Sequence, residues 1–362
     1  MLQQLLDIIG NFNPNQITQT QVLRAIQSNR RSIYDFAALL SPAADLFLEE
    51  MATAAKQETA RHFGNSVQLF TPLYLANYCT NHCTYCAFAQ ANEIKRGKLT
   101  SKEIERELAA IAATGLDEVL LLTGESRQKS DVSYIRQAVQ LAATKFTTVG
   151  LEVYPMDTHE YQALHQAGAD FVNVYQETYN QETYARVHPK GQKRDYEYRF
   201  YSQERALQAG MRGVSLGVLL GLHCFRQDSF AAGVHAYLLQ QKYPHAEIAF
   251  SVPRLRAHAG QPDANITEVT DRNLLQIMLA YRLFMPFAGI TISTREGTHF
   301  RDNVVGLCAT KISAGVMTGV GGHDQAQKGD DQFQISDNRS VPAVHKMLQS
   351  RGLQPVYTNH IF

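Results

Sequence analysis

Residues 115–123 read Gly115-Leu-Asp-Glu-Val-Leu-Leu-Leu-Thr123, in which a glycine leads into an almost continuous apolar run. Upstream of the glycine, Thr100 and Glu103 form a capping box, and apolar residues then recur at helical spacing. Glycine readily adopts the left-handed conformation that ends a helix. A continuous apolar run is typical of a parallel strand that is covered on both faces. The stretch therefore predicts a helix that ends near Gly115 and a buried strand that follows it.

The pattern of a glycine followed four residues later by a valine recurs along the chain. It begins at Gly115, Gly168, Gly210 and Gly352. Strands that alternate with helices predict an α/β fold with a parallel sheet, which we expect to close partly or fully into a TIM-like (β/α) barrel. A doubly wound open sheet is the alternative, although no glycine-rich dinucleotide fingerprint follows the first strand. Apolar runs typical of strands cover residues 69–75, 118–123, 147–153, 170–175, 213–220 and 247–252.

Three regions are expected along the 362 residues. Helical spacing of apolar residues predicts an N-terminal helical extension over residues 1–68. The barrel core is expected over residues 69–255. Mixed helical and short strand signals predict that residues 256–362 form a C-terminal α/β extension that completes the barrel and its pocket.

The composition excludes some partners. Lys and Arg together number 34 and so do Asp and Glu, so no net charge attracts nucleic acid or an anionic membrane. No apolar run approaches the roughly 18 residues that span a bilayer. The first residues lack the basic segment and the long apolar core of a signal peptide. We therefore expect a cytoplasmic protein that binds neither nucleic acid nor membrane.

Three of the five cysteines stand in Cys79-Thr-Asn-His-Cys83-Thr-Tyr-Cys86, directly after the first predicted strand. This crowding predicts a metal site and not a disulfide framework. Three thiolates in one short loop can hold three irons of a 4Fe-4S cluster and leave the fourth iron without a protein ligand.

Other readings of the cysteines each leave something unexplained. A structural zinc site would need His82 as its fourth ligand, and His82 lies between cysteines. A thioredoxin-type redox pair would use only Cys83 and Cys86. A ferredoxin needs a fourth cysteine, and neither Cys224 nor Cys308 has suitable spacing. An iron-sulfur electron carrier without catalytic activity is the non-enzymatic alternative, and a zinc-stabilised interaction module is another.

The cysteine spacing, with an aromatic residue before the last cysteine, resembles the radical S-adenosylmethionine (SAM) superfamily. Further segments, from about residue 40 to the end of the chain, are similar to the tyrosine lyase branch of that superfamily. They are Tyr85-Cys86-Ala87-Phe88, Leu121-Leu-Thr-Gly-Glu125, Val174-Tyr-Gln-Glu-Thr-Tyr179, Ser251-Val-Pro-Arg-Leu-Arg256 and Ser293-Thr-Arg-Glu296.

This resemblance implies a reaction. An electron from the cluster would cleave S-adenosyl-L-methionine into methionine and a 5′-deoxyadenosyl radical, which would take hydrogen from the amino group of L-tyrosine. The Cα–Cβ bond would then break to give 2-iminoacetate (dehydroglycine), p-cresol and 5′-deoxyadenosine, and 2-iminoacetate would supply the thiazole of thiamine. A tyrosine lyase of hydrogenase maturation, or another aromatic amino acid lyase, is the closest alternative. The hydrogenase branch adds cysteines in a C-terminal domain, and no cysteine follows Cys308 here, which favours the thiamine role.

The resemblance also implies roles for single residues, although it assigns no catalytic residue for the substrate proton. Thr123-Gly-Glu125 stands where the superfamily usually has Gly-Gly-Glu. Glu152 would reach the ribose, and Arg199 would pair with the SAM carboxylate, whereas an ordinary ion pair is the simpler role for either. The expected SAM-binding residues are Tyr85, Thr123, Gly124, Glu125, Glu152 and Arg199, and the expected tyrosine-binding residues are Tyr74, Arg295 and Ser313.

Two protein partners are implied in the same way. A flavodoxin or ferredoxin-type donor would reduce the cluster, and a thiazole synthase subunit would receive the unstable imine. Lys95, Arg96 and Lys98 are a candidate docking patch for the donor, and a solvated helix face is the alternative reading of these three residues.

Overall fold

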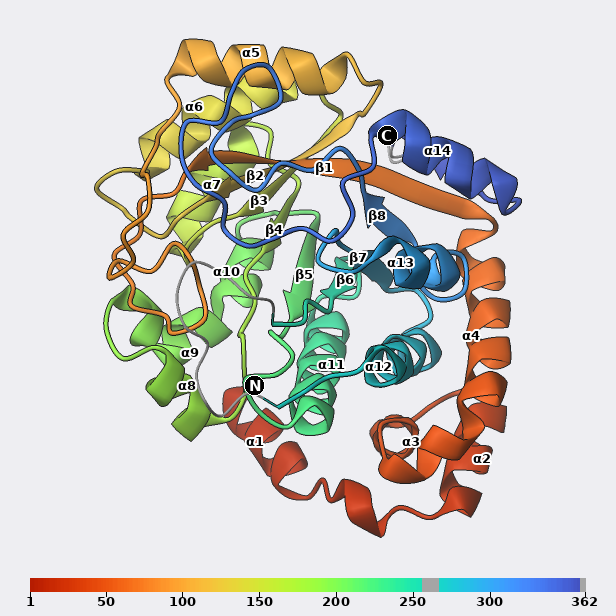
Figure 1. The fold of residues 1–362 in the computed structure, drawn as a ribbon. Helices are drawn as coiled ribbons and strands as arrows, with labels where there is room; N and C mark the ends of the chain where they lie inside the picture. The colour runs from red at the N-terminus through yellow and green to blue at the C-terminus, as the bar shows by residue number, and fades with distance from the viewer. Residues whose placement is uncertain (256–266, 359–362) are drawn as a thin grey trace.

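A computed structural model describes residues 1–255 and 267–358 of the protein. They form a closed barrel of parallel strands surrounded by helices (Figure 1). The strand order runs from β2 through β8 to β1, and β1 also pairs with β2, so the sheet closes on itself. Closure confirms the predicted TIM-like barrel and excludes the open doubly wound sheet. A further strand, β9, pairs with the start of β1 outside the closed ring.

The registers between neighbouring barrel strands fix the shear of the barrel. Tyr74 pairs with Leu122, and Leu122 pairs with Glu152. Continuing these registers through β4 to β8 returns to β1 at Ser66, so the shift is 74 − 66, or eight residues. A shift of eight is the shear of TIM barrels. The strands are β1 (Ser66–Ala76), β2 (Glu118–Thr123), β3 (Thr148–Glu152), β4 (Phe171–Asn173), β5 (Gly213–Gly217), β6 (Glu247–Ser251), β7 (Gly289–Ile292), β8 (Lys311–Ser313) and β9 (Gln354–Val356).

Helices precede the barrel and connect its strands. Those before β1 are α1 (Leu2–Gly10), α2 (Gln19–Gln27), α3 (Ile33–Leu39) and α4 (Leu48–Phe63), with short 3-10 turns at Pro14–Gln16 and Pro42–Phe47. Those that follow β1 are α5 (Ser101–Ala112), α6 (Val132–Ala143), α7 (Thr158–Gln166), α8 (Gln181–Val187), α9 (Tyr196–Phe200), α10 (Ser202–Gln208), α11 (Phe225–Lys242), α12 (Asp271–Phe284), α13 (Thr298–Val304) and α14 (Val341–Ser350), with a 3-10 turn at Gln192–Arg194.

The glycine pattern has the conformation that the sequence predicts. Gly115, Gly168, Gly210 and Gly352 all have positive φ, between 72° and 112°, and each lies between a helix and the strand that follows. Thr100 caps α5 in a complete capping box with Glu103. Helix ends and strand starts are therefore set by local sequence at these four places.

Aromatic packing joins the N-terminal helices to the barrel. Phe250 of β6 stacks on Tyr281 of α12 with ring centroids 4.0 Å apart, and Phe36 of α3 stacks on Phe284 of α12 at 4.3 Å. The apolar side chains of α12, such as Leu274, Ile277 and Met278, are buried, as expected for a core helix. The expected boundary at residue 68 falls inside β1, which begins at Ser66.

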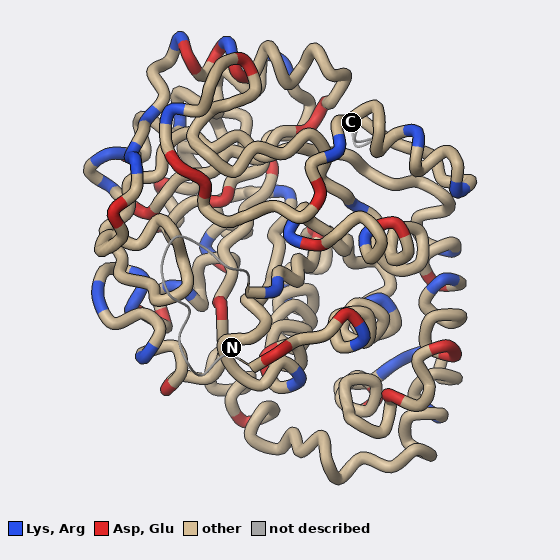
Figure 2. Tube along the Cα trace, viewed as in Figure 1, with Lys and Arg blue, Asp and Glu red and all other residues tan. Residues whose placement is uncertain are grey.

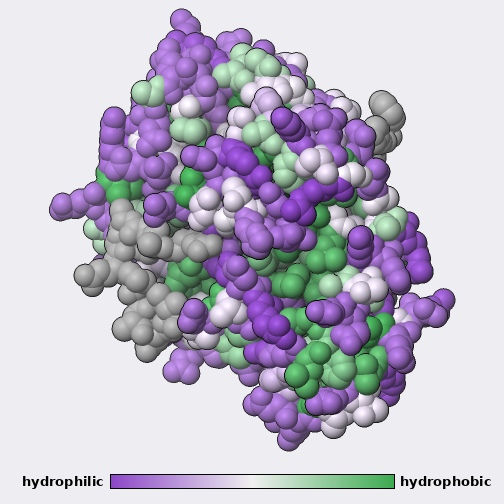
Figure 3. All heavy atoms as spheres, turned by 45° about the vertical axis from the view of Figure 1, so that its right-hand side comes forward, coloured by the Kyte–Doolittle hydropathy of each residue, from purple (hydrophilic) through white to green (hydrophobic). Residues whose placement is uncertain are grey.

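Residues of both charge signs are interspersed along the chain (Figure 2). Hydrophobic side chains gather in the lower part of the face shown in Figure 3, where the N-terminal helices lie. The exposed residues Leu23 and Leu46 belong to this N-terminal region. No helix within residues 1–255 and 267–358 combines the length and apolar character needed to cross a membrane.

Phe250 tests the packing of the barrel against α12. We expect Phe250→Ala to lower the free energy of unfolding by about 3–5 kcal/mol, because it leaves a cavity beside Tyr281. The control is Leu46→Ala, since Leu46 is 68% exposed. Urea denaturation measures the free energy of unfolding of both variants. Equal values for the two variants would contradict the packing of Phe250 against α12.

Candidate active site at the carboxyl ends of the barrel strands

A cavity of about 1150 Å³ lies inside the barrel. Its lining includes Tyr74 at the end of β1, Glu152 at the end of β3 and Arg295 just after β7, so the cavity reaches the carboxyl ends of the strands. These ends are where barrel enzymes place their reacting groups. Tyr85 and Cys86, from the loop after β1, also line the cavity.

The three clustered cysteines lie in this loop, which connects β1 to α5. Protein contacts hold the loop in shape. The Thr80 backbone N–H donates to the carbonyl of Glu125 at 3.1 Å, and the Asn81 side chain donates to the Glu125 carboxylate at 2.8 Å. The Arg96 guanidinium donates to the carbonyls of Asn77, Phe88 and Ala89 at 2.7–2.8 Å.

The donor set fits an iron-sulfur cluster. Cys79, Cys83 and Cys86 are free thiols, and Cys86 lines the cavity. Burial raises the pKa of Cys79 to about 11 and raises the pKa of Cys83 and of Cys86, while the positive charge of Lys193 opposes the shift at the last two. Iron binding would supply the stabilisation that these buried thiolates need.

Single-ion binding has different requirements from cluster binding. Across the described part of the chain, no three His, Cys, Asp or Glu side chains are grouped to hold one metal ion. A 4Fe-4S cluster needs a wider arrangement, because each thiolate binds a different iron.

The Thr123-Gly-Glu125 segment at the end of β2 needs glycine at its second position. A Cβ atom on Gly124 would lie 2.3 Å from the carbonyl oxygen of Tyr78. Thr123 ends β2, and its hydroxyl is buried without a partner among the residues described. The departure from the usual Gly-Gly-Glu pattern therefore leaves the essential glycine in place.

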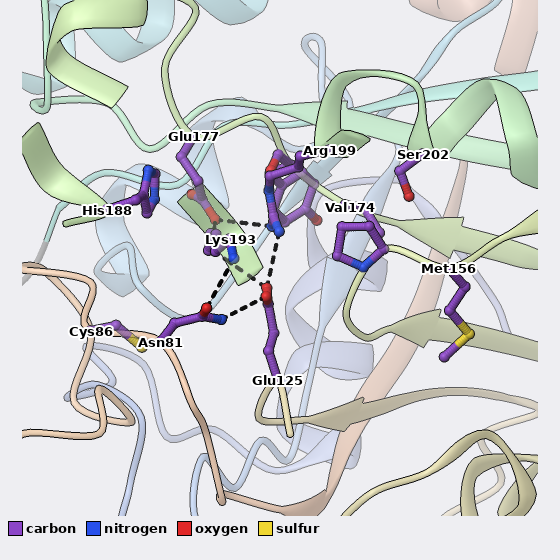
Figure 4. A network of polar contacts seen from close by, with 12 residues as sticks. Asn81, Cys86, Glu125, Met156, Val174, Glu177, His188, Lys193, Arg199 and Ser202 are labelled. Carbon is purple, nitrogen blue, oxygen red and sulfur yellow. Dashed lines mark hydrogen bonds and ion pairs between the residues drawn. The ribbon is translucent and has the colours of Figure 1, made fainter. Parts of the chain in front are cut away.

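Four charged side chains form a buried network beside the cysteine loop (Figure 4). Arg199 lies 3.0 Å from the Glu125 carboxylate and 3.4 Å from that of Glu177. Lys193 lies 2.6 Å from Glu177 and 3.7 Å from Glu125. Two cations and two carboxylates balance, which reduces the cost of burying them. The structure thus brings the expected residues Glu125 and Arg199 together, and adds Glu177 and Lys193.

Glu177 has an unusual backbone. Its φ is 70°, and no other non-glycine residue among those described has a positive φ. Such strain clusters at functional sites. The sequence gives one indirect signal for Glu177, its place after a barrel strand, whereas no sequence signal pointed to Lys193.

Tyr85 is oriented by a histidine. Its hydroxyl lies 2.7 Å from Nε2 of His188, whose Nδ1 lies 2.9 Å from the carbonyl oxygen of Tyr184. A carbonyl only accepts, so Nδ1 carries the proton and Tyr85 donates to Nε2. Burial, together with the charges of Lys193 and Arg199, lowers the pKa of His188 to about 2, which keeps its ring neutral.

The residues expected to bind tyrosine lie on the same cavity. The Arg295 guanidinium stacks on Phe333 at 3.5 Å, and it makes no ion pair or side-chain hydrogen bond to any described residue. The hydroxyl of Ser313 is buried and likewise lacks a partner within the described ranges. The Tyr74 hydroxyl donates to the Gln332 side chain at 2.7 Å. Gln332 and Phe333 were not expected from the sequence, because their loop has no recognisable motif.

The proposed docking patch is not a helix face. Lys95, Arg96 and Lys98 lie in the loop between β1 and α5. The Arg96 guanidinium donates hydrogen bonds to backbone carbonyls of that loop. The Lys98 ammonium lies 3.9 Å from the centre of the Tyr134 ring. Lys95 is exposed. Arg256, the last residue of one matched segment, lies outside the described residues.

Glu152 makes stability depend on pH. Burial raises its pKa from 4.5 to about 7, with Arg295 opposing the shift and Glu177 adding to it. The folded protein therefore keeps a proton that the unfolded chain releases between these pH values, so stability falls as the pH rises through this window. We expect urea denaturation to show that the free energy of unfolding of the wild type falls between pH 4.5 and about 7. In Glu152→Gln, which has no carboxyl group to titrate at this position, the fall should be smaller. The exposed control Glu197→Gln should follow the wild type, and parallel curves for all three would refute the assignment.

Comparisons with known proteins agree with this geometry. Residues 73–225 match the Radical SAM superfamily, and residues 251–354 match the Biotin and Thiamin Synthesis associated domain. The chain is 40% identical to 2-iminoacetate synthase of Escherichia coli (strain K12), covering 95% of this chain and 91% of that protein. It is 37% identical to 2-iminoacetate synthase of Salmonella typhimurium, with the same two coverages.

A solved structure extends the comparison to the fold. The crystal structure of HydG, a maturase of the FeFe-hydrogenase, matches with a TM-score of 0.91 and 29% identity, covering 99% of this chain and 80% of that one. Sequence identity is higher to the synthases than to this maturase. The chain therefore belongs to the 2-iminoacetate synthase family of the radical SAM superfamily.

Proposed function

We propose that this protein is a radical SAM lyase that cleaves the Cα–Cβ bond of L-tyrosine to 2-iminoacetate and p-cresol, with release of methionine and 5′-deoxyadenosine. The observation that supports this most is the 40% identity to 2-iminoacetate synthase across 95% of the chain. The three cysteines, the buried charge network and the cation of Arg295, which pairs with no carboxylate among the described residues, add support, since they lie in or beside one cavity. The 2-iminoacetate would serve thiazole synthesis.

The protein's own residues would hold two cofactors. Cys79, Cys83 and Cys86 would bind the 4Fe-4S cluster. When bound, the cluster and SAM together supply a carbon-centred radical that takes a hydrogen atom from the substrate. Glu125 and Arg199 would orient the amino and carboxylate groups of SAM. Both already pair with other side chains, so the network must exchange partners when SAM binds.

Glu152 would accept hydrogen bonds from the ribose of SAM, and Tyr85 would contact the same cofactor. Glu152 lines the cavity, and its raised pKa allows it to be neutral or charged near pH 7. Tyr85 offers a ring of fixed orientation, because its hydroxyl donates a hydrogen bond to Nε2 of His188.

Arg295 would bind the carboxylate of tyrosine. Its guanidinium is covered on one face by Phe333, and no side chain within the described ranges accepts a hydrogen bond from the N–H donors at its edge. A planar fork of donors matches a carboxylate with two parallel hydrogen bonds. Ser313 would offer its hydroxyl as a further hydrogen-bond donor to the substrate. Tyr74 would line the pocket, with its own hydroxyl donating to Gln332.

A role in hydrogenase maturation is the second candidate, because the TM-score to HydG is 0.91. Complementation separates the two. We expect the gene to restore growth without thiamine to a strain that lacks 2-iminoacetate synthase, and failure with active protein present would favour the maturation role. A flavodoxin or ferredoxin-type electron donor and a thiazole synthase subunit are the partners that the thiamine role requires.

An anaerobic product assay tests the activity. We expect reconstituted protein with SAM, tyrosine and a low-potential reductant to form p-cresol and 5′-deoxyadenosine together. Cys83→Ala should abolish both products, because a cluster ligand is lost. The control is Cys308→Ala, which removes a buried thiol between α13 and β8 and should keep activity. Formation of 5′-deoxyadenosine without p-cresol would reject tyrosine as the substrate.

Arg295→Lys tests the carboxylate site. Lysine keeps the positive charge but loses the planar fork, so we expect the KM for tyrosine to rise at least about tenfold. Arg351→Lys, at the exposed end of α14, is the matched control and should leave KM unchanged. An unchanged KM in Arg295→Lys, measured by p-cresol formation, would place the carboxylate elsewhere.

A further inference from the structure

The cysteine loop comes to the surface at Thr80. All of residues 79–86 are described, and Thr80 is the one among them that is exposed, whereas the other seven are buried or partly buried. Thr80 directly follows Cys79, and the Cα atoms of successive residues lie about 3.8 Å apart. A protein that donates an electron has to approach a bound cluster from outside the barrel. The way in from solvent is short at Thr80.

Two segments lie against the cysteine loop on either side of Thr80. The first follows β2, and the backbone N–H and the hydroxyl of Thr80 donate to the carbonyl of Glu125 at 3.1 and 3.0 Å. The second follows α8, and its Lys190 carbonyl accepts from the backbone N–H of His82 at 3.0 Å. A Cβ atom on Gly191 would lie 2.9 Å from the carbonyl oxygen of Thr80, so glycine lets this segment touch the loop.

The two segments carry three exposed cations, which we call the cationic rim: Lys129, Lys190 and Arg194. Lys129 belongs to the segment after β2, and its ammonium lies 5.4 Å from the centre of the ring of Tyr78, just before the first cysteine. The other two belong to the segment after α8. The Arg194 guanidinium donates to the carbonyl of Pro189 at 2.7 Å, which folds the side chain back over its own segment.

No acidic residue within the two segments offsets the rim. Residues 126–129 and 188–194 contain no Asp or Glu, although acidic and basic residues balance at 34 each over the whole chain. The acids that come next, Asp131 and Asp195, cap the helices that follow, α6 and α9. A local excess of positive charge attracts a negatively charged partner and speeds its encounter.

The basic residues expected from the sequence are less suited to this role. Arg96 donates to carbonyls within the cysteine loop, and Lys98 packs on an aromatic ring. Lys95 is exposed, but its backbone N–H donates to the carboxylate of Asp330 at 2.9 Å, so an acidic group lies beside it. The rim has no such neighbour within its own segments.

We propose that Lys129, Lys190 and Arg194 form the docking surface for an acidic electron-transfer protein of the flavodoxin type. This inference rests on the proposed radical SAM function. The donor's carboxylates would contact the rim and bring its flavin close to Thr80. The reduced flavin then loses one electron, the cluster gains that electron, and no atom passes between the two proteins. Charge contacts of this kind act mainly on the association rate and are screened by salt.

The test measures reduction of the cluster and not turnover. Anaerobic stopped-flow absorbance follows the reconstituted holoenzyme mixed with a reduced acidic flavodoxin or with photoreduced 5-deazariboflavin, which is small and uncharged. We expect K129E/K190E/R194E to lower the second-order rate constant with flavodoxin by at least about tenfold at low salt, and by less at about 0.5 M salt. The rate with deazariboflavin should stay within about twofold of the wild type. Calorimetry with oxidised flavodoxin should show weaker binding.

The matched control is K56E/K346E/R351E, which reverses two lysines and one arginine as the rim variant does. All three residues are exposed, on α4 and at α14, and Figure 1 shows these helices on the side of the barrel away from the loop between β1 and α5. The control should keep the flavodoxin rate within about twofold of the wild type. K95E should do the same. An equal loss in the control and the rim variant would assign the effect to net charge and overturn the docking surface.

The possible failures are distinguishable. A wild type that makes no p-cresol with deazariboflavin as the reductant rejects the proposed lyase function. A wild type that makes p-cresol, with a rim variant that flavodoxin reduces at the same rate, overturns the docking surface and leaves the lyase function intact. Should the rim variant lose its cluster, K129Q/K190Q/R194Q is measured in the same way and must lose rate with flavodoxin alone.

Discussion

The pairing of β1 with both β2 and β8 is the constraint on which the site depends. It closes the sheet and places the carboxyl ends of the strands around one rim. Small residues then keep the interior open. A Cβ atom on Gly150 would lie 2.3 Å from the ring of Phe171, so glycine at this position makes room for that ring beside the cavity. The interiors of TIM barrels are usually filled by side chains, whereas this one keeps space for ligands.

The buried charge network is the second organising element. Charged groups taken out of water are stable only when paired. Glu177, Lys193 and Arg199 come from the segment between β4 and β5, whereas Glu125 follows β2. Their mutual pairing keeps this side of the cavity preformed in the absence of cofactor, and a bound SAM carboxylate would compete with Glu125 and Glu177 for the same cations.

Much of the barrel was predictable because its signals are local. The left-handed glycines, such as Gly115, and the capping box of α5 depend on neighbouring residues alone, and both have the expected form. Strands β7 and β8 were not recognised, because they are only four and three residues long and lack a long apolar run.

The candidate site was predictable where it rests on a motif, as for Cys79 and Glu125. Lys193 and Gln332 were not predictable, because their roles arise from contacts between segments far apart in the sequence. Lys193 reaches Glu125 only after the barrel closes, and Gln332 reaches Tyr74 across 258 positions. No spacing rule encodes such contacts. The roles of the expected site residues stay predictions until the variants are measured.

The carbonyl contacts of Arg96 tie the two flanks of the cysteine loop together. One guanidinium reaches Asn77, which precedes Cys79, and also Phe88 and Ala89, which follow Cys86. The relative placement of the three thiols therefore depends on a side chain that lies outside the Cys79–Cys86 motif.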